Sequence, residues 1–150
     1  MNIIQAEQKD IKTVKEITQT TIKYVYPKYY PKGAVDLFIN YHSDERIISD
    51  ISNGYVYLLE DDGKITGTVT VEENHIGRLF VLPAYQHKGY GRALLDFSED
   101  LIFRSFNSIK LDASLPAKKI YLLRGYKEVE YNIDPADGDF LCYDVMVKER

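Results

Sequence analysis

The chain of 150 residues lacks most of the signals that would place it in a specialised class of protein. Cys142 is its only cysteine, so no internal disulfide can form, and we expect this thiol to be a small core residue. The formal net charge is only −4, which gives no basic footprint for nucleic-acid binding. No apolar run approaches the roughly 20 residues of a membrane span, and no signal peptide is visible. We therefore expect a cytoplasmic protein that binds neither nucleic acid nor membrane.

Other absences narrow the architecture and the chemistry. Three histidines and one cysteine lie at scattered positions without ligand spacing, so no metal site is predicted. There is no internal repeat and no low-complexity segment. With 45% apolar residues, the chain is long enough to bury one core, and we expect a single domain over residues 1–150. The oligomeric state stays open between a monomer and a homodimer.

The most informative segment is residues 79–95, in which an apolar strand runs into a glycine-containing loop and then into a helix. Gly89 and Gly91 allow a sharp turn and the close approach of a ligand. The helix that follows directs its unpaired N–H groups and the positive end of its dipole toward the loop, an arrangement that binds phosphate. The dinucleotide fingerprint is excluded because its third glycine would fall at Leu94, and no Gly-Lys-Ser or Gly-Lys-Thr follows for an ATP-type loop.

Apolar periodicity and turn residues predict the order of elements along the chain. Residues 24–41 are aromatic and interrupted by prolines, so no helix is expected to run through Pro27 and Pro31. Asp62-Gly63 predicts a tight turn between two strands, and residues 134–139 read as an acidic loop. The predicted order is a strand near 1–5, helices from 11 and after Ser43, strands at 55–60, 64–71 and 75–82, a helix at 92–106, a strand from 109, a helix between Pro116 and Gly125, and strands near 126–131 and 140–148. This order is typical of an α/β sheet with helices on its faces.

Two motifs resemble those of the GCN5-related N-acetyltransferase (GNAT) superfamily. Gln86-His87-Lys88-Gly89-Tyr90-Gly91, after Val81-Leu82-Pro83, is similar to the loop that holds the acetyl-CoA pyrophosphate in that family. About 30 residues later, Tyr121-Leu-Leu-Arg-Gly-Tyr126 is similar to the end of the family's next helix but one. The resemblance implies a mixed, mostly antiparallel sheet of about seven strands flanked by about four helices. It also implies acetyl-CoA as co-substrate and no metal.

The resemblance further implies roles for individual residues. The strand that ends near Leu82 would offer backbone groups to the pantetheine arm, and the loop would wrap the pyrophosphate with its N–H groups. Ser114 stands where many relatives carry an asparagine that holds the cofactor. The predicted cofactor-binding residues are Phe80, Val81, Leu82, Gln86, His87, Lys88, Gly89, Tyr90, Gly91, Arg92 and Ser114.

For catalysis, the resemblance points to Tyr121 and His75. Tyr121 would hydrogen-bond the leaving sulfur, because a tyrosine pKa near ~10 and a thiol pKa near ~8.5 make a complete proton transfer uphill. His75 stands where the histone-modifying branch carries a glutamate base. Three alternatives stay open. His75 could be an exposed turn residue beside Asn74, the base could be Glu72 or Glu73, or the reaction could rely on water without a side-chain base.

The acceptor is predicted to be a primary amine of a small molecule or a protein. Clustered tyrosines offer a cation–π surface, so Tyr26, Tyr30 and Glu73 are the predicted substrate-binding residues, while His42 is expected to belong to a helix cap. Two alternatives compete with the N-acetyltransferase hypothesis. One is a non-catalytic acyl-CoA-binding regulatory module with the same fold, and the other is a nucleotide-binding α/β domain.

Overall fold

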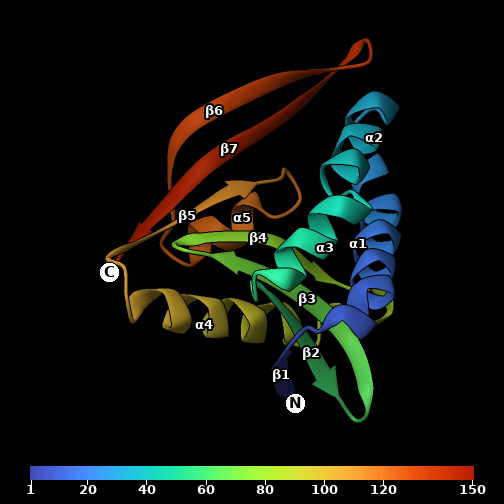
Figure 1. The fold of residues 1–150 in the computed structure, drawn as a ribbon. Coiled ribbons are helices and arrows are strands. Elements are labelled where there is room, and N and C mark those ends of the chain that lie inside the picture. The colour runs from blue at the N-terminus through green and yellow to red at the C-terminus, as the bar shows by residue number, and fades with distance from the viewer.

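Seven strands form one sheet in the computed structural model, which describes residues 1–150 (Figure 1). The strands are β1 (Asn2–Gln5), β2 (Val56–Asp61), β3 (Lys64–Glu72), β4 (His75–Val81), β5 (Ser108–Ala113), β6 (Lys127–Ala136) and β7 (Asp139–Glu149). Their order in the sheet is β1-β2-β3-β4-β5-β7-β6. All neighbouring pairs are antiparallel except β4 and β5, which are parallel. The predicted fold class, a mixed and mostly antiparallel α/β sheet, is confirmed.

Helices cover both faces of this sheet (Figure 1). The α-helices are α1 (Ile11–Val25), α2 (Lys32–Tyr41), α3 (Asp44–Ser52), α4 (Tyr90–Phe103) and α5 (Lys118–Leu123), and the short 3-10 helices are η1 (Gln8–Asp10), η2 (Tyr26–Lys28) and η3 (Pro83–Tyr85). In none of them do length and apolar character together reach what crossing a bilayer requires. We call α1, α2 and α3, which lie together on one face, the wall helices.

Two apolar clusters hold these layers together. One packs the wall helices on the sheet through residues such as Ile17, Ile47 and Leu58, all nearly inaccessible to solvent. The other packs α4 and α5 on the opposite face and includes Leu94 and Met146. Gly67 allows α4 to approach closely, because a Cβ atom there would lie 3.0 Å from the Leu94 side chain. The close approach fixes the helix that follows the predicted phosphate loop.

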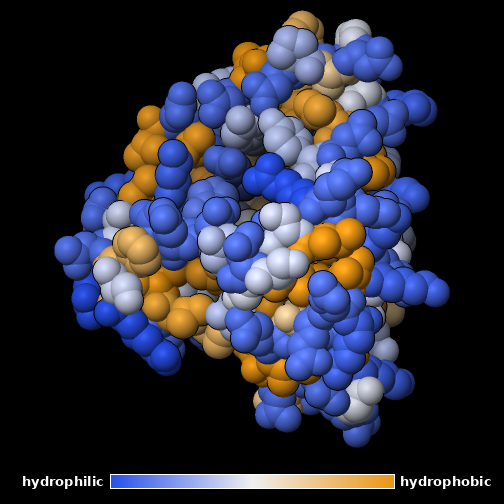
Figure 2. All heavy atoms as spheres, in the orientation of Figure 1, coloured by the Kyte–Doolittle hydropathy of each residue, from blue (hydrophilic) through white to orange (hydrophobic).

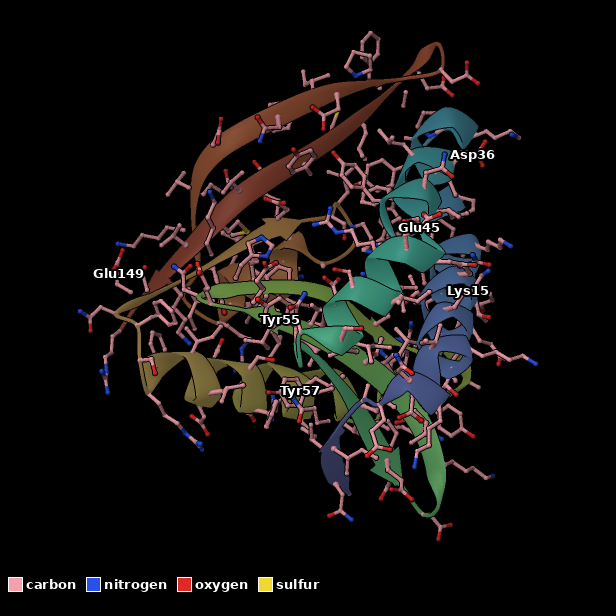
Figure 3. All side chains as sticks on the ribbon, in the orientation of Figure 1. Lys15, Asp36, Glu45, Tyr55, Tyr57 and Glu149 are labelled. Atoms are coloured by element: carbon pink, nitrogen blue, oxygen red, sulfur yellow. The ribbon has the colours of Figure 1, made fainter.

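The outer surface of the wall helices is polar, as expected for amphipathic helices. Figure 3 places Lys15, Asp36 and Glu45 on α1, α2 and α3. Lys15 pairs with Asp44 at 2.8 Å, and Asp36 pairs with Lys32 at 2.7 Å. These exposed pairs add little stability, so the apolar inner faces position the helices.

The sheet opens between β4 and β5. These strands are paired only at His75 with Lys110 and at Ile76 with Leu111. Beyond Ile76, the edge of β4 that faces β5 has no strand partner, and its backbone groups are free to bind another extended chain. On its other side, β4 remains paired with β3 as far as Val81.

No α-helix runs through Pro27 or Pro31, as expected, but the sequence did not predict α2, which begins directly after Pro31 at its N-cap. Two local expectations need correction. The expected acidic loop is largely strand: β6 runs to Ala136, and only Asp137 and Gly138, both at positive φ, make the turn. Cys142 is only partly buried, because the β6–β7 hairpin extends beyond the core (Figure 1).

Candidate active site

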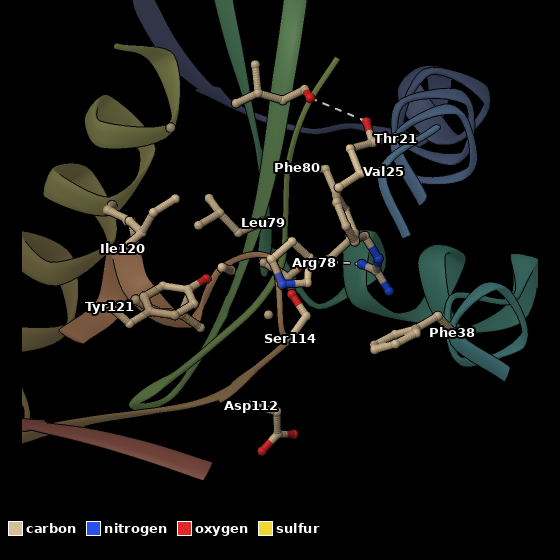
Figure 4. A pocket seen from close by; sticks show the side chains of 18 of the residues that line it. Thr21, Val25, Phe38, Arg78, Leu79, Phe80, Asp112, Ser114, Ile120 and Tyr121 are labelled. Atoms are coloured by element: carbon tan, nitrogen blue, oxygen red, sulfur yellow. Dashed lines mark hydrogen bonds between the residues drawn. The ribbon is translucent and has the colours of Figure 1, made fainter. Parts of the chain in front are cut away.

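A cleft of about 720 Å³ lies at the opening between β4 and β5. Its lining comes from the wall helices, β4, the loop before α4, the end of β5, α5 and β7. Figure 2 shows the molecule hollowed between the wall helices and the β6–β7 hairpin. Figure 4 looks into the cleft, with Tyr121 and Ile120 on one side and Phe38 on the other. The two motifs of the sequence, residues 86–91 and 121–126, therefore meet around one cavity.

The loop before α4 presents a row of unused donors. Gly89 is the N-cap of α4 at φ +86°, a left-handed conformation that favours glycine, and no side chain caps the helix. The N–H groups of residues 87–92 donate to no backbone carbonyl. A Cβ atom on Gly91 would have only Val81 as a neighbour, at 4.0 Å, so the space in front of these donors is open. Six free N–H groups at a helix N-terminus are suited to a diphosphate.

Side chains hold this loop in place from behind. Gln86 donates through Nε2 to the Val81 carbonyl at 3.0 Å. The Tyr90 hydroxyl donates to Asp61 at 2.6 Å, which anchors the start of α4 to the β2–β3 hairpin. The Lys88 ammonium lies 5.4 Å from the centre of the Tyr85 ring. Gln86 and Tyr90 therefore use their side chains to position the loop. Their predicted contact with a cofactor would come from their backbone groups instead.

Tyr121 lies across the cleft from the wall helices. Tyr121 is only 7% exposed. Its ring packs against Tyr126 with centroids 5.5 Å apart, and its hydroxyl points into the cleft (Figure 4). Burial raises the pKa of this hydroxyl, and nearby Tyr26 raises it further. The group therefore stays protonated and can act as a hydrogen-bond donor.

An ion pair lies in the floor of the cleft, beside β4. Arg78 has φ +45° where the β3–β4 register shifts, and its side chain is only 3% exposed. Its guanidinium donates to Asp50 at 2.8 Å and to the Thr70 hydroxyl at 2.9 Å, while Nε has no partner. Sequence reasoning missed this pair. The available signal was a lone arginine inside an apolar strand, which requires a buried partner.

His42 also belongs to the cleft. It follows α2 at its C-cap, and its ring meets Phe80 edge-on with centroids 5.7 Å apart. Burial, with smaller contributions from Arg78 and Arg46, lowers the pKa of His42 to about 3. The imidazole is therefore neutral at physiological pH. The helix cap that the sequence predicts here is made by Ser43, whose Oγ accepts from the Arg46 N–H at 3.3 Å.

His75 lies at the far end of β4. Its Nε2 is 4.0 Å from an Asp112 carboxylate oxygen. Burial lowers the His75 pKa, and Asp112 opposes that shift. His75 precedes Leu79 by four positions, roughly 13 Å along a regular β-strand, and it lines the same cleft as Leu79 and Tyr121.

The structure gathers most of the predicted site residues into the cleft. The residues that line it are Tyr26, His75, Phe80, Val81, Gln86, His87, Tyr90, Gly91, Arg92, Ser114 and Tyr121. Lys88 and Gly89 lie in the loop just outside the lining, and Leu82 donates its N–H to the Thr66 carbonyl at 2.9 Å. Glu73 does not reach the cleft, because it lies in the exposed β3–β4 turn at φ +53°. Tyr30 does not line the cleft either, because its hydroxyl is bound to backbone groups.

Comparisons with known proteins agree with this geometry. The sequence profile of the acetyltransferase (GNAT) domain matches residues 25–141. No curated protein sequence matches the chain.

Among solved structures, a GCN5-related N-acetyltransferase from Rhodopseudomonas palustris superposes with a TM-score of 0.90 at 20% identity, covering 99% of this chain and 95% of the other. The PaiA N-acetyltransferase from Thermoplasma acidophilum, solved with coenzyme A, gives 0.75 at 21% identity and covers 99% and 98%. The ribosomal-protein-S18-alanine N-acetyltransferase from Escherichia coli gives 0.74 at 20% identity and covers 99% and 92%. At these identities the likeness establishes the fold.

Proposed function

We propose that this chain, which belongs to the GNAT acetyltransferase family, transfers an acetyl group from acetyl-CoA to a primary amine. The observation that carries the proposal is the row of free N–H groups at residues 87–92, because four of these residues line the same cleft as Tyr121. With its diphosphate bound at these N–H groups, the rest of the cofactor would extend along β4 toward the Tyr121 hydroxyl. The PaiA enzyme, which was solved with coenzyme A, supports this choice of ligand.

The unpaired edge of β4 supports the placement of the pantetheine arm. That arm is extended and carries amide groups, so it can hydrogen-bond to the edge beyond Ile76 as an added strand would. Arg92 and His87 line the cleft beside the free N–H groups and would add contacts to the phosphates. Ser114 would contact the cofactor near the end of β5. The thioester would then lie near Leu79 and Tyr121.

The proposed reaction is direct attack in a ternary complex. The amine nitrogen bonds to the thioester carbon, the carbonyl oxygen becomes an oxyanion, and the carbon–sulfur bond then breaks. A backbone N–H of β4 near Val81 would stabilise the oxyanion. Tyr121 would donate a hydrogen bond to the departing sulfur. Because burial raises its pKa above the usual value near ~10, complete proton transfer to a thiolate costs more than about 2 kcal/mol.

The nitrogen must also lose a proton. His42, with a pKa of about 3, is too weak a base, because taking a proton from an ammonium of pKa near ~10 costs about 10 kcal/mol. His75 lines the cleft at the start of β4, four positions before Leu79, so we propose that it acts through water. The acceptor amine therefore reacts best when it arrives neutral.

The test combines a binding measurement with an assay of released CoA thiol. Calorimetry with acetyl-CoA should give binding, and thiol release should appear with at least one member of a panel of small primary amines and peptides with free N-termini. The panel includes peptides because the Escherichia coli relative is named for a protein alanine. Binding without thiol release across the panel would instead favour a non-catalytic acyl-CoA-binding module. No binding of acetyl-CoA would contradict both readings.

A further inference from the structure

Two tyrosines of the segment after α1 reach across to the residues that lead into α5. Tyr30 is 6% exposed, and its hydroxyl accepts a hydrogen bond from the Leu115 N–H at 2.7 Å. The same hydroxyl donates to the Cys142 carbonyl of β7 at 3.1 Å. One buried hydroxyl therefore joins the segment before α2 to the β5–α5 connection and to β7.

Tyr26 lies beside the same connection. It is 8% exposed, and burial raises the pKa of its hydroxyl, a shift that the neighbouring Ser114 side chain opposes. Its ring meets Phe38 edge-on with centroids 4.6 Å apart, so the hydroxyl is held by a packed aromatic group. Tyr30 thus holds Leu115, and Tyr26 lies beside the adjacent Ser114.

These two adjacent residues determine where α5 begins. The Ser114 carbonyl accepts the N–H groups of Ala117 and Lys118, at 3.1 Å and 3.0 Å, and so makes the turn into the helix. With six residues, α5 is too short to be stable without tertiary contacts. Lys118 adds a contact to Asp144 at 2.9 Å at this end.

The far end of α5 is held differently. Arg124 binds Glu99 of α4 at 2.7 Å, so the end of α5 is fixed to the neighbouring helix on the same face of the sheet. Tyr121 lies between the two attachments, and its hydroxyl points into the cleft (Figure 4). A change at the start of the helix would therefore displace Tyr121 without releasing α5 from the protein.

We propose that Tyr30, supported by Tyr26, is a positioning residue for Tyr121, and that its place in the site is behind the reacting groups instead of against the acceptor. The inference rests on the proposed acetyl transfer, in which Tyr121 must meet the leaving sulfur. A displacement of about 1 Å in a positioned catalytic group is enough to lower turnover strongly. The predicted role of Tyr30 in acceptor binding is replaced by this one.

The main test is Tyr30→Phe, with Tyr29→Phe as the matched control. Tyr29 is 51% exposed and adjacent in sequence, so its hydroxyl should not matter. Tyr30→Phe should lower kcat about fivefold or more while changing the acetyl-CoA affinity by less than about twofold, because the phosphate loop lies elsewhere. An unchanged kcat, or an equal loss in affinity, would overturn the proposal.

A double-variant cycle separates positioning from general structural damage. If Tyr30 acts through Tyr121, then adding Tyr30→Phe to a Tyr121→Phe enzyme should lower kcat by less than about twofold further. The same fold-loss in both backgrounds would contradict action through Tyr121. If Tyr30→Phe does not fold, Tyr26→Phe removes the hydroxyl beside Ser114 and should give the same cycle with a smaller loss.

Hydrogen exchange provides a readout that does not need activity. In Tyr30→Phe, the amides of residues 115–121 should exchange faster than in the wild type, while those of α4 should not change. Unchanged exchange at residues 115–121 would overturn the positioning role. Should the wild type release no CoA thiol, the proposed transfer fails, and the exchange result still decides whether Tyr30 holds the start of α5.

Discussion

The two halves of the cleft are built in different ways. The cofactor half, where we propose that acetyl-CoA binds, comes mainly from one continuous stretch of chain, Leu79 to Arg92. Gln86 supports it from Val81, five residues away, and Tyr90 ties it to Asp61, 29 residues away. The acceptor half combines wall helices, β4, β5 and β7. Its contacts join residues far apart in sequence, such as Tyr30 and Cys142, 112 residues apart. The cofactor half therefore depends mostly on contacts within its own segment, whereas the acceptor half depends on contacts across most of the chain.

The largest effect is expected from removing the buried ion pair of the acceptor half, which should destabilise the whole fold. Asp50→Ala leaves the Arg78 guanidinium buried without a counter-charge, and we expect the free energy of unfolding to fall by about 3 kcal/mol. Urea unfolding followed by circular dichroism measures the loss. The double variant Asp50→Ala/Arg78→Met, which removes both charges, should recover most of it. A double variant no more stable than the single one would argue against the ion pair as the cause.

The cofactor half can be damaged alone at Gly91. Gly91→Asp places a carboxylate where the diphosphate is proposed to bind, and acetyl-CoA affinity should fall about 100-fold, equivalent to about 2.7 kcal/mol. Calorimetry measures the affinity. Gly91→Ala is the control, because its Cβ would meet only Val81, at an ordinary 4.0 Å, and it adds no charge, so its affinity should fall much less than that of Gly91→Asp. Equal loss in both variants would point to a change in the loop backbone.

Tyr121 separates chemistry from cofactor binding. Tyr121→Phe removes the hydroxyl proposed to meet the leaving sulfur, so kcat should fall about tenfold, or about 1.4 kcal/mol, with little change in acetyl-CoA affinity. Steady-state kinetics with the best acceptor from the panel gives both quantities. An unchanged turnover would remove Tyr121 from the mechanism.

The smallest effect concerns the neutral imidazole in the acceptor half. His42 has a pKa of about 3 in the folded protein against 6.5 unfolded, so between these values only the unfolded chain binds the proton. Its contribution to stability is therefore complete above pH 6.5 and is lost as the pH falls toward 3, by at most about 1.4 kcal/mol per pH unit. Urea unfolding at pH 7, 6 and 5 measures this slope. His42→Asn should show a shallower slope, and equal slopes would show that His42 does not titrate in this way.

The same contrast explains what the sequence predicts well. The Asp62-Gly63 turn is confirmed with both residues at positive φ, because a two-residue hairpin requires that conformation whatever surrounds it. The phosphate loop was predicted for a similar reason: glycines and a helix start are local signals. Near Pro31, local reasoning correctly predicted a break in the chain but missed the helix that begins directly after it.

The acceptor half could not be assembled from such signals. Arg78 and Asp50 lie 28 residues apart, and neither sequence segment contains a signal that predicts their pairing. Tyr26 and Tyr30 stand in one tyrosine-rich run and look equivalent in sequence. Only the fold distinguishes them, because it places the Tyr26 side chain in the cleft lining and directs the Tyr30 hydroxyl to the backbone of Leu115 and Cys142.

The short ladder between β4 and β5 has a mechanical consequence. Only two residue pairs join the two parts of the sheet, and the rest of the β4 edge is free to pair with a bound molecule. Acetyl-CoA bound there would be a substrate and would also bridge the two parts. The protein should therefore be more rigid with the cofactor bound than without it.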